Sequence, residues 1–369
     1  MLKLSGNTNG CAVQHQGNGR NGRFDLAAMI FSYMVVMIHS SYASFYHASG
    51  AIDVFLSDYY TDYLPGFAVP SFFMLSAIKF YRNYSYEDTV RKYKSRVNSL
   101  LIPYLAWNFL SVIWIMALSY LPIISHMIAG REKFTFTFSH LVGGLLWFEY
   151  IHPFWYLAML MIFTLLCPVF LTLIRNKIVG VSCIIVLYLL DALPIPFPAT
   201  TWPMFQWRTI VYCTAFYLIG AMIGRYGFDA FCKMPEKHPR FIAVCGYILA
   251  VALRGLTHNH EAVFIPAILI GFVSVWIFTG TIAIKHPDIL SLSFFIYPAH
   301  TFVLPCVNKL LFLVLPKVPW MSIVNTVLGT ALSYAICIVL GLGLRKILPP
   351  SVWGVLNGAR ETTGRENKQ

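Results

Sequence analysis

The chain has 369 residues, of which 58% are hydrophobic and 11% are charged, and its mean hydropathy is +0.66. A soluble domain carries about 25% charged residues, so this composition excludes a soluble globular protein with one membrane anchor. The formal net charge of +12 does not indicate a nucleic-acid partner, because the basic residues fall in short segments between apolar runs, as membrane topology requires.

Apolar runs long enough to cross a bilayer recur along almost the whole chain. One transmembrane helix needs roughly 17–25 such residues. We therefore predict an all-α polytopic membrane bundle of about ten transmembrane helices over 24–347, with a disordered cytoplasmic tail over 1–23 and a second cytoplasmic tail over 348–369. A short aromatic helix at the membrane interface is expected over 134–150. The ten spans are predicted at 24–46, 63–81, 97–121, 153–174, 178–195, 207–226, 240–256, 261–283, 289–315 and 320–346.

The basic residues predict the orientation of the bundle. Of the 27 lysines and arginines, 21 lie in one alternate set of segments and 6 in the other. Segments rich in Lys and Arg stay in the cytoplasm, so both termini are expected there, in a bacterial inner membrane. The loop expected after the first span carries Asp53, Asp58 and Asp62 without a basic residue, which suits an outer position.

The first predicted span contains two ionisable residues, Asp25 and His39. They are 14 residues apart, which is about 21 Å along a helix, so they mark two depths. The imidazole of His39 can accept a proton from an alcohol near neutral pH. The alternative is a histidine at the outer interface, satisfied by water or a backbone carbonyl. Asp25 either has a function or is a carboxylate favoured by the dipole of the first helical turn.

Four basic side chains precede the third span, in residues 91–96. Together Arg91, Lys92, Lys94 and Arg96 form a cluster that could bind the phosphates of a nucleotide-like donor in the cytosol. The alternative is that these residues only fix the topology.

Polar and aromatic residues gather before the fourth span. Glu149, His152 and Trp155 are candidates for an acceptor site, because a carboxylate binds hydroxyls and aromatic rings stack on the apolar faces of sugars. The alternative is an aromatic belt at the membrane interface. In the ninth span, His300 is expected to be a buried histidine bonded to a neighbouring helix. In the second span, residues 67–77 are expected to serve close helix packing, with a kink at Pro70.

Five stretches, taken in order, resemble the acyltransferase family 3 membrane proteins, which O-acylate surface carbohydrates. The first span resembles that family's opening segment, with Asp25 and His39 at its Asp and His positions. The other four stretches are "FAVPSFFMLSA", "KSRVNSLLIPYLAWN", "HPFWYLAMLMIFTLLCPV" and "LSFFIYPAHTFVL". The family usually has an arginine three residues after the aspartate, where this chain has Ala28.

The resemblance implies an acyl-CoA donor, most often acetyl-CoA, used as a co-substrate on the cytoplasmic side, with no permanently bound cofactor and no metal. It implies His39 as the general base on a carbohydrate hydroxyl and Asp25 as a group that orients a cytoplasmic-side partner. Lys94 and Arg96 would hold the donor phosphates, helped by Arg23 and Arg91. Glu149, His152 and Trp155 would line the carbohydrate side.

Two other interpretations fit the same sequence. One is a carrier, an exporter or flippase of a polysaccharide or lipid-linked sugar without acyl-transfer chemistry. The other is a family member that has lost catalysis, because Ala28 replaces the arginine.

Overall fold

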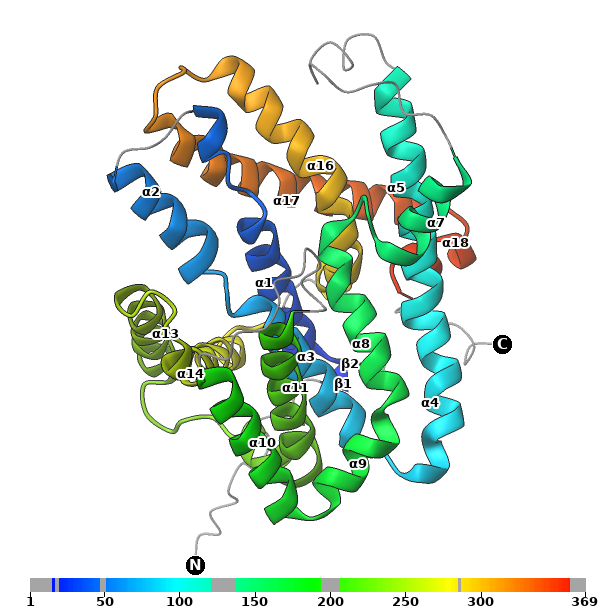
Figure 1. The fold of residues 1–369 in the computed structure, drawn as a ribbon, viewed down its shortest axis with the longest axis vertical. Coiled ribbons are helices and arrows are strands. Elements are labelled where there is room, and N and C mark those ends of the chain that lie inside the picture. The colour runs from blue at the N-terminus through cyan, green and yellow to red at the C-terminus, as the bar shows by residue number, and fades with distance from the viewer. Residues whose placement is uncertain are drawn as a thin grey trace, which may run out of the picture.

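The computed structural model describes residues 15–16, 20–46, 51–120, 137–193, 206–284 and 287–358. Within these ranges two short strands, β1 (His15–Gln16) and β2 (Arg20–Asn21), pair antiparallel just before the first long helix. Most of the tail predicted to be disordered lies outside the described residues. In the described residues that follow β2, the chain forms helices, turns and short connections (Figure 1).

The first part of the chain forms long helices broken by short 3₁₀ or π turns, which are labelled η. In order they are α1 (Gly22–Ile38), η1 (Ala43–Tyr46), α2 (Ala51–Asp58), η2 (Tyr59–Tyr63), α3 (Ala68–Tyr81), η3 (Tyr86–Asp88), α4 (Thr89–Arg96), η4 (Val97–Leu101), α5 (Ile102–Tyr120), α7 (Phe138–Trp147), η5 (His152–Phe154), α8 (Trp155–Leu165), α9 (Cys167–Arg175) and α10 (Lys177–Ala192).

The second part continues in the same way. Its elements are α11 (Trp207–Met222), η7 (Ile223–Gly227), α12 (Phe228–Cys232), α13 (Pro239–Leu256), α14 (Glu261–Gly280), α15 (Pro287–Leu290), α16 (Ser293–Val314), α17 (Met321–Ile347) and α18 (Pro350–Leu356). α18 lies in the predicted C-terminal tail, where it packs against the bundle: Trp107 of α5 donates its ring N–H to the carbonyl of Leu356 at 3.1 Å.

The polytopic all-α bundle is confirmed. Among the described residues, 8 helical stretches are long and apolar enough to cross a membrane, and the bent pair His152–Leu165 and Cys167–Arg175 raises the number to 9. α10, at 16 residues, is shorter than these. Each predicted span therefore matches a helix, while the number ten and the side on which the termini lie stay predictions.

Three details differ from the sequence-based expectation. The outer loop expected to carry Asp53, Asp58 and Asp62 is helical, since these residues lie in α2 and η2. The fourth span is bent by 63° between α8 and α9; Pro168 in the first turn of α9 has no N–H to continue the helix. In the second span, an irregular turn over 64–67 precedes α3, so Pro70 lies in the first turn of α3, where proline is tolerated.

α1 lies at the centre of the bundle, packed against α3, α14, α16 and α17 (Figure 1). The expected close packing of the second span is confirmed in the pair of α3 and α11. Gly220 of α11 and Gly224 of η7, four residues apart, lie on the α3 backbone at Met74 and Ile78 so closely that a Cβ on either glycine would collide with it. Small residues at this spacing let two membrane helices approach closely.

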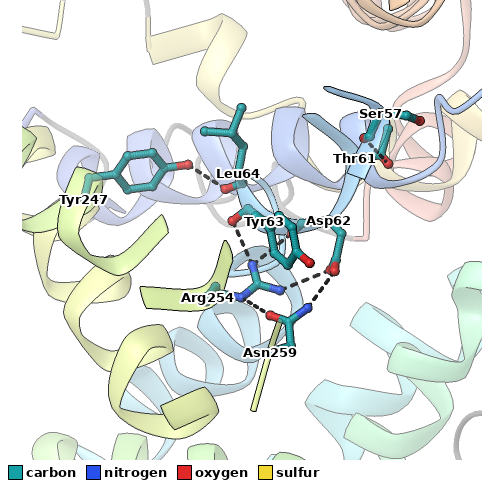
Figure 2. Close-up of polar contacts among 8 residues, drawn as sticks. All are labelled: Ser57, Thr61, Asp62, Tyr63, Leu64, Tyr247, Arg254 and Asn259. Atoms are coloured by element: carbon teal, nitrogen blue, oxygen red, sulfur yellow. Dashed lines mark hydrogen bonds and ion pairs between the residues drawn. The ribbon is translucent and has the colours of Figure 1, made fainter. Parts of the chain in front are cut away.

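A buried arginine joins the end of α13 to the last residues of η2, just before α3. Arg254 is 2% exposed, and its Nη1 donates to the carbonyls of Asp62 at 2.9 Å and Tyr63 at 2.8 Å. Its Nη2 lies 3.1 Å from the Asp62 carboxylate, and its Nε donates to Asn259 Oδ1 at 2.9 Å. Figure 2 shows this cluster, in which Asn259 also donates to Asp62. The cluster fixes where α3 begins relative to α13.

Candidate functional site

His39 and His300 lie side by side inside the bundle, although 261 residues separate them in the sequence. Their ring centroids are 5.5 Å apart and the ring planes differ by 27°. His39 is the first residue after α1 and its side chain is accessible to water, yet protein atoms surround it as densely as they surround buried groups. The two facts together place His39 at a water-accessible position in the interior rather than on the lipid-facing surface.

His300 is buried, as expected, but its bond is not to a neighbouring helix. The side chain is 1% exposed, and its Nδ1 lies 3.3 Å from the carbonyl oxygen of Ile296 on the same helix. Within the described part of the chain, no group bonds to its Nε2. Nε2 of His300 is therefore a buried nitrogen without a hydrogen-bond partner among the described residues, next to His39.

The segment η5 packs against α16 and is hydrogen-bonded to it, one turn from His300. The Tyr297 hydroxyl donates to the carbonyl of Pro153, and the rings of Tyr297 and Phe154 stack at 5.7 Å with planes 6° apart. These contacts bring His152, the first residue of η5, close enough to His39 to interact with it electrostatically. The structure thus gathers His39, His152 and His300.

The other two predicted acceptor residues flank η5. Glu149 is exposed in the turn after α7, and a Cβ on Gly143 would overlap its carboxylate, so the carboxylate lies against α7. Trp155 begins α8 and is half-buried against the hydrophobic core.

The predicted donor-side cations do not share one face of α4. Residues two apart on a helix point to different sides, and residues four apart share a face. Accordingly Arg96 and Lys92 both cover the ring of Phe80, at 5.5 Å and 5.0 Å from its centroid. The family resemblance had given Lys92 no role of its own. Lys94 is exposed on another face. Reading residues 91–96 as a helix would have identified Lys92.

Arg91 and Arg23 are occupied by protein partners. Arg91 is an exposed side chain paired with Asp88 at 2.6 Å. Arg23 is 4% exposed, and its guanidinium donates to the carbonyls of Trp276 and Cys232 and to the sulfur of Met234. Four of its five N–H groups are thus engaged in holding α1 against α14 and the end of α12.

Asp25 lies in the first turn of α1 and is partly exposed. Because α1 is continuous to Ile38, Asp25 is about 21 Å along the helix from His39. The structure therefore does not bring these two predicted catalytic residues together.

Aromatic side chains join the basic face of α4 to the histidines. Arg96 lies close enough to Tyr156 for electrostatic interaction. The rings of Tyr156 and Tyr297 are 6.0 Å apart, and those of Tyr297 and His300 are 6.4 Å apart. A line of neighbouring side chains thus runs through the bundle from Arg96 to His39.

A separate cavity of about 590 Å³ lies where α13 begins. Its walls include His238, Arg240, Phe241 and Thr281. Its lining residues include none of the predicted site residues, and Arg23 lies beside two of them, Met234 and Gly280.

These features define a multi-pass membrane protein with histidines and cations in its interior. A family model described as an acyltransferase domain matches residues 21–342. The chain belongs to this family, acyltransferase family 3, and is a membrane acyltransferase. Comparisons with curated proteins and with solved structures gave no match.

Proposed function

We propose that the protein transfers an acyl group, most simply acetyl, from cytosolic acyl-CoA to a hydroxyl of a cell-surface or exported carbohydrate, in the bacterial inner membrane. The observation that carries the proposal is the position of His39: a water-accessible imidazole inside the bundle of a membrane acyltransferase. A carrier for sugars has no need of a base at that position.

The donor phosphates bind at the basic face of α4. Lys92 and Arg96 point together toward Phe80 and are assigned the phosphates, while Lys94 lies on the exposed side and Arg91 stays paired with Asp88, so both contribute less. Charge-assisted hydrogen bonds from Arg and Lys are well suited to phosphate. Arg23 already holds α1 in place, so we assign it no phosphate. Asp25, in the first turn of α1, is assigned to the cytoplasmic side.

His39 acts as the general base. The acceptor oxygen attacks the carbonyl carbon of the thioester while its proton passes to the imidazole. The C–S bond then breaks, and the leaving thiolate takes the proton from the imidazolium. The products are the carbohydrate ester and free CoA, and no metal or redox group is required. Glu149, His152 and Trp155, which surround η5 and the start of α8, bind the carbohydrate.

The test is acyl transfer in membranes that contain the protein. With radiolabelled acetyl-CoA and glycan isolated from the same cells, the wild type should form ester and release one thiol per ester. His39→Ala should reduce ester formation at least 100-fold at equal protein level, because general-base catalysis contributes about 10²–10⁴ in rate. His260→Ala, which removes an exposed histidine at the start of α14, serves as the matched control.

Mass spectrometry of the surface glycan separates the proposal from the carrier. Loss of the gene should remove an ester from the glycan and leave its amount at the surface unchanged. Unchanged ester with less glycan at the surface would show a carrier instead, and full activity of His39→Ala would remove the assigned base.

A further inference from the structure

We propose that His300 binds a second hydroxyl of the carbohydrate, next to the one that reacts at His39, so that the acceptor is a vicinal diol. This inference rests on the proposed function and adds the substrate class. Its basis is the open Nε2 of a buried histidine beside the assigned base.

The first step concerns the tautomer of His300. Its Nδ1 faces the carbonyl of Ile296, and a carbonyl oxygen only accepts hydrogen bonds, so Nδ1 carries the proton. The neutral ring then presents Nε2 as a lone pair. A nitrogen in this state accepts a hydrogen bond and cannot donate one.

The second step concerns the partner of Nε2. No group of the described residues bonds to this atom, although buried polar atoms in proteins are nearly always paired. His39 does not supply the bond either: its ring centroid lies 5.5 Å from that of His300, and no hydrogen bond from it reaches Nε2. We therefore assign to Nε2 a donor that binds from outside the described part of the chain.

The third step identifies the donor. The reacting hydroxyl has one proton, and His39 takes it, so this hydroxyl does not also donate to His300. The carbonyl and sulfur of a thioester carry no proton. Next to the reacting hydroxyl, the groups that a sugar offers are neighbouring hydroxyls, each of which has one O–H to donate. Tyr297 places His300 next to η5, the segment assigned to the carbohydrate.

Two substitutions at position 300 test this assignment. In His300→Asn the side-chain amide replaces Nδ1–H toward Ile296 but leaves nothing at the place of Nε2. In His300→Gln an amide oxygen can reach that place. Losing one hydrogen bond to a neutral hydroxyl, worth about 0.5–1.5 kcal/mol, should raise the KM for isolated glycan about three- to tenfold in His300→Asn, with the KM for acetyl-CoA unchanged. His300→Gln should restore most of the loss.

A wild-type KM for glycan in His300→Asn would overturn the inference, and so would a rise in the KM for acetyl-CoA, which would assign Nε2 to an amide N–H of the donor arm. If both variants fail to fold, NMR of the wild-type product decides: the esterified carbon should neighbour a carbon with a free hydroxyl, and an ester on an isolated hydroxyl would overturn the inference. Ester formation by the wild type keeps the proposed function in each of these cases, while its absence refutes both.

Discussion

Replacing Arg254 by methionine should be among the most destabilising single changes at the junction of η2, α3 and α13. Methionine preserves the length and apolar bulk of the side chain but removes every N–H. The carbonyls of Asp62 and Tyr63 and the amide oxygen of Asn259 then lose the guanidinium that bonds to them. A buried acceptor left without its donor costs about 1–3 kcal/mol. Because two backbone carbonyls lose their donor, we expect Arg254→Met to lower the free energy of unfolding by about 2–6 kcal/mol.

The control is Asp62→Asn. The Asp62 side chain is 53% exposed, so water replaces much of its ion pair, and exposed pairs contribute about 0–1 kcal/mol. The backbone carbonyl of Asp62 still accepts from Arg254. We therefore expect this variant to lose at most about 1 kcal/mol.

Reversible unfolding of the purified protein in mixed micelles, followed by tryptophan fluorescence during SDS titration, measures both variants. If Arg254→Met and Asp62→Asn lowered the free energy of unfolding equally, the main partner of the Arg254 guanidinium would be the Asp62 carboxylate rather than the backbone carbonyls. If Arg254→Met lowered the free energy of unfolding by less than about 1 kcal/mol, Arg254 would not be what stabilises the junction of η2, α3 and α13.

Three further outcomes are expected. Lys92→Met should raise the KM for acetyl-CoA at least tenfold in the membrane assay, whereas Lys94→Met should change it less than threefold; the reverse order would contradict the assigned face of α4. Gly220→Leu should abolish folded protein in size-exclusion profiles, because its side chain meets the α3 backbone; a wild-type profile would disprove the close packing. Tyr297→Phe, which removes the bond to Pro153, should lower kcat/KM for glycan about three- to tenfold at unchanged donor KM.

The spans could be predicted from sequence because hydrocarbon burial selects long apolar runs wherever they occur. The positions at which these helices bend or break could be predicted less well. The bend at Leu166 has a local cause in Pro168, but prolines 298 and 305 lie inside α16 without ending it. Neighbouring helices can support a proline within a membrane span, so tertiary packing decides which proline bends the chain.

The candidate site was predicted residue by residue but not as an arrangement. His39 and the basic segment of α4 follow from their chemistry. The stacking of His39 with His300 has no local signal, since it depends on how α1 and α16 pack. Helical periodicity could have shown that Lys92, rather than Lys94, shares a face with Arg96. Using this periodicity requires that the segment before the third span be recognised as a helix, which it is.

The hydrogen bonds of Arg23 fix the position of α1, and this position sets the depth at which His39 lies. One end of the helix is fixed by four hydrogen bonds of this guanidinium, and His39 lies 16 residues further on, at a height of about 24 Å. The hydrocarbon layer is about 30 Å thick. If Arg23 lies at the cytoplasmic side, as the distribution of basic residues predicts, and the donor is cytosolic, as proposed, the acyl group must cross most of the bilayer before it reacts. A donor that carries its acyl group at the tip of a slender, flexible arm meets this requirement, and a bulky donor without such an arm does not.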